Sequence, residues 1–101
     1  MFRRSRFARI VETQLDVFVR HHRDLTDEVE QRLAAYNRAD RSEAEELYGD
    51  YVDALDSAAD ALAEMRDNYA RTVDDPDEYA RAFNRAAKRR LPEYARELES
   101  R

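Results

Sequence analysis

The sequence predicts an all-α domain, on three grounds: composition, periodicity and turn residues. The 101 residues include one glycine, two prolines and sixteen alanines, and 41% of them are charged. A β-sheet would need more turn-forming and β-branched residues. Six tyrosines, four phenylalanines and a regular apolar spacing argue against a disordered chain of similar charge. We therefore predict a single helical domain over residues 1–101.

The first predicted helix runs from about Arg4 to Tyr36. Its apolar residues recur every three or four positions, as one face of a helix requires: Phe7, Val11, Leu15, Phe18, Leu25, Val29, Leu33 and Tyr36. His22 falls in the same series, so we expect a continuous helix in which His22 hydrogen-bonds to a neighbouring helix or to water. A break is the alternative, because Asp24 or Thr26 is able to cap a new helix.

The second predicted helix begins at Ser42, which forms a capping box with Glu45. A heptad repeat follows that is typical of a coiled coil: Ala44, Tyr48, Tyr51, Leu55, Ala58, Leu62, Met65, Tyr69 and Thr72. Further apolar residues widen this stripe: Leu47, Val52, Ala54, Ala59, Ala61 and Val73. A stripe this wide indicates contact with two neighbours, so we expect this helix at the centre of the bundle.

The third predicted helix follows Asp75, an N-cap with Pro76 at the first helical position and Glu78 completing a capping box. It buries Tyr79, Phe83, Ala87, Leu91, Tyr94 and Leu98. Pro92 lacks a backbone donor, so we expect a kink or a break near Leu91.

Short turns between long helices make neighbouring helices antiparallel. The predicted architecture is therefore an up-down-up antiparallel three-helix bundle, with long first and second helices and a third helix kinked near Pro92. Because the third helix is shorter, part of the first two projects beyond it. We expect a partner chain to cover the apolar stripe there.

Residues that carry catalytic or metal chemistry are sparse. The chain has no cysteine, which excludes disulfides, zinc–thiolate sites and thiol nucleophiles. His21 and His22 are the only histidines, and neither belongs to the Glu-x-x-His pair of a di-metal helical bundle. A single glycine excludes a glycine-rich phosphate loop. We therefore predict a protein that is not an enzyme, with no catalytic residue, metal or cofactor.

Charge is unevenly distributed along the chain. Residues 1–23 and 81–101 each carry a net charge of +4, whereas residues 24–80 carry −13. The second predicted helix has an acidic outer face, interpreted as solvated: Glu46, Asp50, Asp53, Asp60, Glu64 and Asp67. The basic ends provide candidate phosphate-binding residues: Arg3, Arg4, Arg6, Arg9, Arg85, Lys88, Arg89 and Arg90. The negative net charge favours another interpretation, in which these bases form salt bridges with the acidic second helix.

Tyrosine is the commonest aromatic residue of the apolar stripes. Its hydroxyl needs a polar partner, so such residues lie at the rim of a core or at an interface. The candidate partner interface comprises Tyr48, Tyr51, Tyr69, Tyr79 and Tyr94. We therefore favour a non-enzymatic interaction or scaffold module that binds a protein partner or self-associates as a homo-oligomer. A nucleic-acid- or ribosome-associated protein that binds phosphate through its basic ends is the alternative.

The sequence also bears on location. No apolar run is long enough to cross a membrane. Glu12 and Asp16 interrupt what would have to be the apolar stretch of a signal peptide. We expect a cytoplasmic protein.

Overall fold

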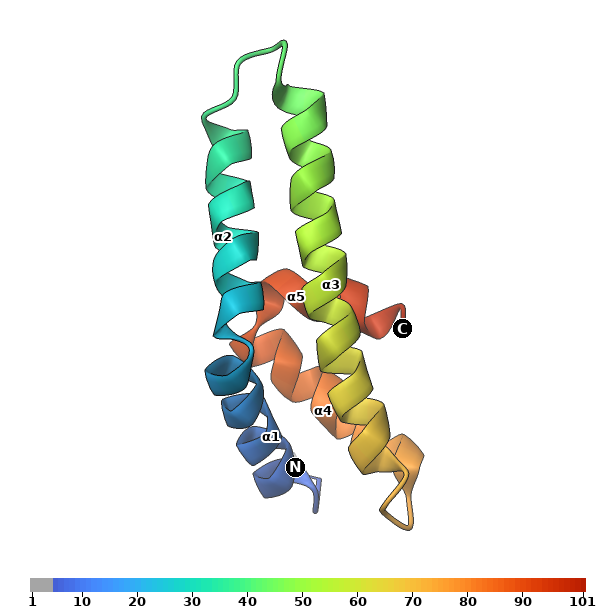
Figure 1. Ribbon diagram of the computed structural model, residues 1–101. Helices are drawn as coiled ribbons and strands as arrows, with labels where there is room; N and C mark the ends of the chain where they lie inside the picture. Colours follow the sequence, from blue (N-terminus) through green and yellow to red (C-terminus); the bar gives the residue numbers. More distant parts are fainter. Residues whose placement is uncertain (1–4) are drawn as a thin grey trace.

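The computed structural model describes residues 5–101, which form five helices and no strand (Figure 1). The helices are α1 (Ala8–His21), α2 (Arg23–Asn37), α3 (Ala44–Ala70), α4 (Pro76–Arg90) and α5 (Pro92–Glu99). The all-α class is confirmed. The three-helix bundle is wrong, because the first and third predicted helices are each divided into two. Arg3 and Arg4 lie outside the described residues.

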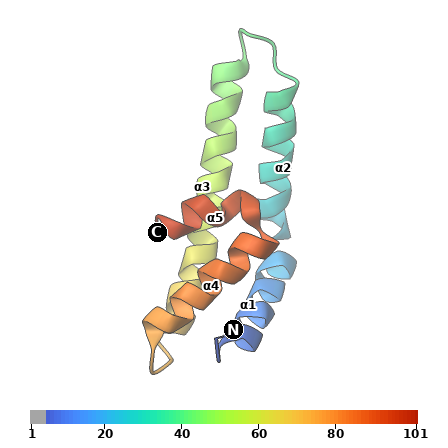
Figure 2. The same ribbon diagram turned by 180° about the vertical axis from the view of Figure 1, so that it is seen from behind.

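Helix α3 is central and contacts each of the other four helices. With α2 it forms a long antiparallel hairpin, whose upper half in Figure 1 projects beyond the rest of the molecule. Helices α1 and α4 flank the lower half of α3, and α5 crosses α3 near its middle (Figure 2). The molecule is accordingly elongated, with extents of 51 × 29 × 21 Å. The central position expected for this helix is confirmed.

The first predicted helix breaks at His22, whose φ of −116° and ψ of 33° are not helical. His22 is the single residue between the two helices, and it is hydrogen-bonded to both of them. Its N–H donates to the Phe18 carbonyl at 2.9 Å, and its carbonyl accepts from the Leu25 and Thr26 N–H groups at 3.1 Å. It lets α1 pack against α4 while α2 packs against α3. The expected continuity is therefore wrong. The alternative of a break is confirmed, but its predicted cap is wrong, because His22 rather than Asp24 or Thr26 occupies the N-cap position of α2, without a side-chain cap bond.

The capping predicted before α3 and before α4 has different outcomes. Before α3, Asp40 organises the turn, because its Oδ1 accepts from the Ser42 hydroxyl at 2.7 Å and from the Glu43 N–H at 3.1 Å. The hydrogen bond from Ser42 holds the pKa of Asp40 below its usual value. The predicted Ser42 cap is therefore wrong. Before α4, the predicted Asp75 cap is confirmed, since Asp75 Oδ1 accepts from the Glu78 N–H at 3.1 Å.

The core lies where α1, α3, α4 and α5 meet. All six core positions predicted for the third helix are buried: Tyr79, Phe83, Ala87, Leu91, Tyr94 and Leu98. In α3, by contrast, buried residues begin only at Ala58, and α2 buries only Val29. The projecting half of the hairpin therefore contributes only partly buried residues to the core, among them Tyr51 and Leu55.

The chain also breaks at Leu91, as the following proline predicts, and α5 turns across α3. Arg66 of α3, which is only 5% exposed, fixes this crossing. Its guanidinium donates to the Leu98 carbonyl at 3.2 Å and to the Arg101 carbonyl at 2.9 Å. It also donates to Asn84 Oδ1 of α4 at 3.1 Å. One buried cation thus joins α3, α4 and the end of α5.

Replacing Arg66 with Met is expected to lower the free energy of unfolding by about 2–3 kcal/mol, because the buried bond to the Leu98 carbonyl and the partly buried bond to the Arg101 carbonyl both lose a charged donor. Urea denaturation followed by circular dichroism measures this loss. Arg85→Met on the exposed side of α4 is the matched control and should change stability by less than about 0.5 kcal/mol. Equal losses in the two variants would contradict the role of Arg66.

Tyr79 lies fully buried in an aromatic cluster. Its ring stacks on Tyr69 at 5.0 Å between centroids and meets Phe7 edge-on at 5.6 Å. Within residues 5–101, its hydroxyl is the one buried side-chain polar atom without a hydrogen-bond partner. Burial raises the pKa of Tyr79 to about 12, from an ordinary value of 10.0. The folded state therefore favours the neutral phenol.

Tyr79→Phe is expected to raise the free energy of unfolding by about 1 kcal/mol, because an unpaired buried hydroxyl is costly. In the wild type, the neutral phenol stabilises the fold below pH 10, and this contribution is lost as the pH rises towards 12. Tyr79→Phe should therefore lose less stability over that range. Urea titrations at alkaline pH measure both effects. Tyr48→Phe, at an exposed position, should behave like the wild type.

Candidate interaction surface

The projecting half of the α2–α3 hairpin carries an apolar surface, here named the hairpin face. It consists of Leu33 and Tyr36 of α2 and of Tyr48, Tyr51, Val52 and Leu55 of α3. Leu33 is 39% exposed and Tyr48 is 50% exposed, and the other four residues are partly buried. Among residues 5–101, the one other large hydrophobic side chain exposed to this degree is Ile10 of α1.

The hairpin face continues a surface that α5 covers lower on α3. Tyr48, Val52 and Leu55 lead in helical steps of four and three to Ala59 and Leu62, which are buried. One turn further on, Arg66 hydrogen-bonds to the Leu98 carbonyl of α5. The same side of α3 is therefore covered by α5 around Ala59 and Leu62. Towards the turn, Tyr51 and Leu55 still pack against the edge of the core, and beyond them the hairpin projects past α5 (Figure 2).

Three tyrosines connect the two helices of the projecting hairpin. The rings of Tyr36 and Tyr48 lie 5.2 Å apart, and those of Tyr48 and Tyr51 lie 6.1 Å apart. Aromatic pairs at such distances stabilise one another beyond the area they bury. A tyrosine also presents a large apolar ring with a polar edge at little cost in conformational entropy, as residues at protein interfaces commonly do.

Carboxylates border the hairpin face. Asp27 and Glu30 of α2 precede Leu33, Glu45 of α3 lies one turn before Tyr48, and Glu93 lies in α5. No cationic group within residues 5–101 forms a salt bridge with any of the four. Burial raises the pKa of Tyr94 to about 12, and the negative charges of Glu93, Glu30 and Asp27 contribute to the increase. These three acids are therefore close to the edge where α5 meets the hairpin.

The structure separates the five tyrosines of the predicted partner interface. Tyr48 and Tyr51 belong to the hairpin face. Tyr69 is partly buried beside α1, whereas Tyr79 and Tyr94 are buried in the core, since α4 and α5 pack their tyrosines onto α3. The last two are unavailable to a partner in this fold. Leu33, Val52 and Leu55 were part of the predicted apolar stripes but not of the predicted interface.

Half of the described bases of the predicted phosphate sites, namely Arg6, Arg89 and Arg90, are engaged within the fold. Arg90 lies 3.0 Å from Glu12 and 2.5 Å from Asp16, and Arg89 lies 3.1 Å from Glu12. Arg6 likewise pairs with Asp74 at 2.6 Å and with Glu78 at 3.1 Å.

These pairings correct one expectation. The bases complement acids inside the chain, but Arg89 and Arg90 pair with α1 and Arg6 with the start of α4, rather than with the acidic second helix. Arg9, Arg85 and Lys88 form no salt bridge with a described residue.

The acidic outer face of α3 is partly neutralised by arginines. Asp60 lies 2.5 Å from Arg101, Asp67 lies 2.8 Å from Arg66, and Asp50 lies 3.9 Å from Arg32. In the chain from residue 5 onward, no group of three or more His, Cys, Asp or Glu side chains is arranged to hold a metal ion.

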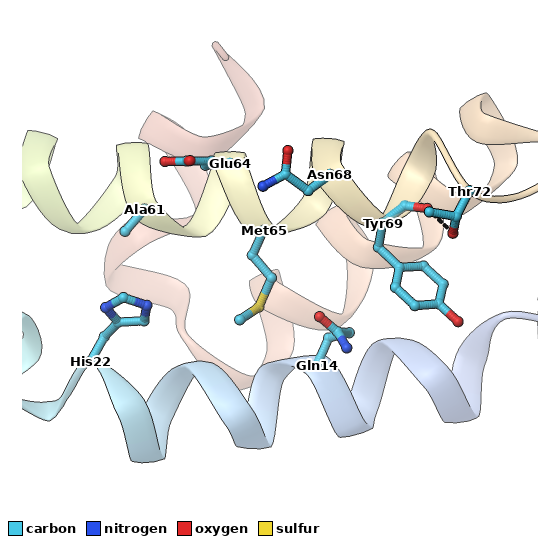
Figure 3. Close-up of a pocket in the computed structure, with 8 residues that line it drawn as sticks. All are labelled: Gln14, His22, Ala61, Glu64, Met65, Asn68, Tyr69 and Thr72. Atoms are coloured by element: carbon cyan, nitrogen blue, oxygen red, sulfur yellow. Dashed lines mark hydrogen bonds between the residues drawn. The ribbon is translucent and has the colours of Figure 1, made fainter.

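A groove of about 480 Å³ runs between α1 and α3 (Figure 3). Met65 extends from α3 towards α1, and Gln14 extends from α1 towards α3. His22 lines the same groove, with its ring 5.1 Å from that of Phe18. Its side chain forms no hydrogen bond with a described residue, so the neighbouring-helix bond expected for it is absent. His22 and Glu64 are not hydrogen-bonded, so the groove contains no acid–base pair.

Arg90→Ala is expected to lower the free energy of unfolding by up to about 1 kcal/mol, because it removes the ion pairs that hold α1 to α4. Urea denaturation at low salt measures the loss, which should shrink at high salt. Lys88→Ala, on the same helix and without an ion pair, is the control and should change stability by less than about 0.5 kcal/mol. A salt-independent loss would contradict the electrostatic explanation.

Comparison with known proteins gives no relative for this arrangement. The chain matches no protein-family model, no curated protein and no solved structure. None of the helices within residues 5–101 combines the length and the apolar character needed to span a membrane.

Proposed function

We propose that the protein is a non-enzymatic helical interaction module and that a helix of a partner protein binds to its hairpin face. The observation that carries this proposal is the uncovered continuation of the surface that α5 buries lower on α3. Leu33 and Tyr48 are large, apolar and solvent-exposed at this place. An exposed apolar surface bordered by polar residues is a common mark of a protein-binding site.

The manner in which α5 packs supports a helix as the bound element. Tyr94 and Leu98 of α5 are buried with Ala58 and Leu62 of α3 in the same core cluster. The hairpin face presents the next turns of the same side of α3. A second amphipathic helix placed there would extend the packing that α5 begins, in the way that helices commonly bind to apolar grooves.

Phosphate binding by the basic ends has less support. Arg6, Arg89 and Arg90 already pair with carboxylates of the chain, so a phosphate would have to compete with these ion pairs. Absorbance of the purified protein at 260 and 280 nm, read at low and high salt, tests this alternative, because nucleic-acid binding weakens steeply with salt.

The hairpin face can be tested with helical peptides selected from a display library on the intact chain. Leu33→Glu and Tyr48→Glu should each weaken peptide binding by at least about tenfold, because each buries a charge at the centre of the interface. Ile10→Glu is the matched control, since Ile10 is exposed to a similar degree on α1, and it should leave binding unchanged. Fluorescence anisotropy gives the dissociation constants, and circular dichroism checks that each variant folds.

Two results would contradict the proposal. One is peptide binding that survives Leu33→Glu and Tyr48→Glu but is lost in Ile10→Glu, which would place the site on α1. The other is a selection in which no peptide binds the chain and light scattering finds a monomer at all concentrations. A dimer that Tyr48→Glu dissociates would instead assign the hairpin face to self-association.

A further inference from the structure

The charge of the hairpin indicates which kind of helix it binds. Residues 24–56, from the start of α2 to the middle of α3, contain eleven acidic residues and three arginines. One of these arginines, Arg32, pairs with Glu28 at 3.5 Å and approaches Asp50 at 3.9 Å. The acids Asp27, Glu30 and Glu45 beside the hairpin face have no such partner among the described residues.

We propose that the hairpin face binds a basic amphipathic helix, whose apolar side packs on Leu33 and Tyr48 while its Lys or Arg residues pair with Asp27, Glu30 and Glu45. This inference rests on the proposed function and adds the charge of the partner. Each carboxylate lies about one helical turn before the next residue of its series: Asp27 precedes Glu30, Glu30 precedes Leu33, and Glu45 precedes Tyr48. Acidic side chains therefore accompany the apolar surface on both helices of the hairpin.

The length of the uncovered surface fits a helix of about two to three turns. It extends over about residues 44–52 of α3, roughly 13 Å of helix, because Tyr51 and Leu55 at its lower end already pack against the core. Glu93, at the start of α5, stands at the lower boundary of this surface. A partner helix that ends there with a basic residue would meet its carboxylate.

A second copy of this chain is a poorer occupant. Two hairpin faces in contact would bring two strongly acidic segments together, and like charges placed across an interface oppose association. A helix with a basic border would be attracted by the charge of the hairpin, whereas a second acidic hairpin would be repelled.

The test uses three synthetic amphipathic helices with the same apolar side and with Lys/Arg, Gln/Ser or Glu along its borders. At low salt, the basic peptide should bind the intact chain at least about tenfold more tightly than the neutral one, and the acidic peptide should bind most weakly. The advantage of the basic peptide should shrink as salt is added, because exposed charges are screened. Titration of the ¹⁵N-labelled chain locates the bound peptide.

Matched charge variants separate the effect of the acids beside the hairpin face from the effect of the protein's net charge on peptide binding. The double variant Asp27→Asn/Glu30→Gln should remove most of the preference for the basic peptide while the neutral peptide still binds. Glu28→Gln/Asp53→Asn is the control, since it removes two charges from another side of the same hairpin, where both residues line a groove with Leu25 and Ser57. The control should keep the preference.

The outcomes distinguish the inference from the proposed function. If the neutral and basic peptides bind the hairpin face equally well, the inference is overturned and the interaction module stands. If both double variants lose the preference equally, the effect is one of net charge and the inference is again overturned. If no peptide perturbs Leu33, Tyr48 or their neighbours, the proposed function fails as well.

Discussion

The position of α5 across the middle of α3 determines both the core and the candidate site, and Arg66 is the residue that holds it there. A guanidinium buried to this extent must have its donors satisfied, and the carbonyls of Leu98 and Arg101 accept two of its hydrogen bonds. These carbonyls lie at the end of α5, so the helix has to cross α3 beside Arg66. Because α5 is short and ends there, it covers only the middle of α3, while α4 packs on the C-terminal part. The hairpin face lies on the N-terminal part, which neither helix covers fully.

The two breaks show which parts of the fold the sequence can predict. The break at Leu91 has a chemical cause in the sequence, because Pro92 lacks a backbone donor. The break at His22 has none. The apolar series runs in phase from Phe18 to Leu25, since α1 and α2 both bury that side, and the bend follows from tertiary packing of α1 on α4. Periodicity therefore identifies which residues are buried without showing where a helix must bend.

The same limit applies to the candidate site. The heptad repeat of α3 predicts an apolar stripe along its length, and the stripe is present. Which tyrosines are covered depends on where α5 crosses, and this in turn depends on the hydrogen bonds of Arg66 at long range in the sequence. Tyr94 is therefore buried and Tyr48 exposed, although both occupy equivalent positions in their stripes. The ends of a partly covered stripe cannot be assigned from spacing alone.

Charge and apolar exposure coincide on the hairpin for a related reason. Several basic residues at the two ends of the chain pair away from the projecting hairpin, where Arg89 and Arg90 hold α4 to α1 and Arg101 pairs with Asp56 and Asp60. Residues 24–56 themselves contain only three arginines against eleven acids. The negative charge of the protein is therefore concentrated on the segment whose apolar surface is uncovered. A partner that buries this surface also has to compensate its charge, and a basic amphipathic helix does both.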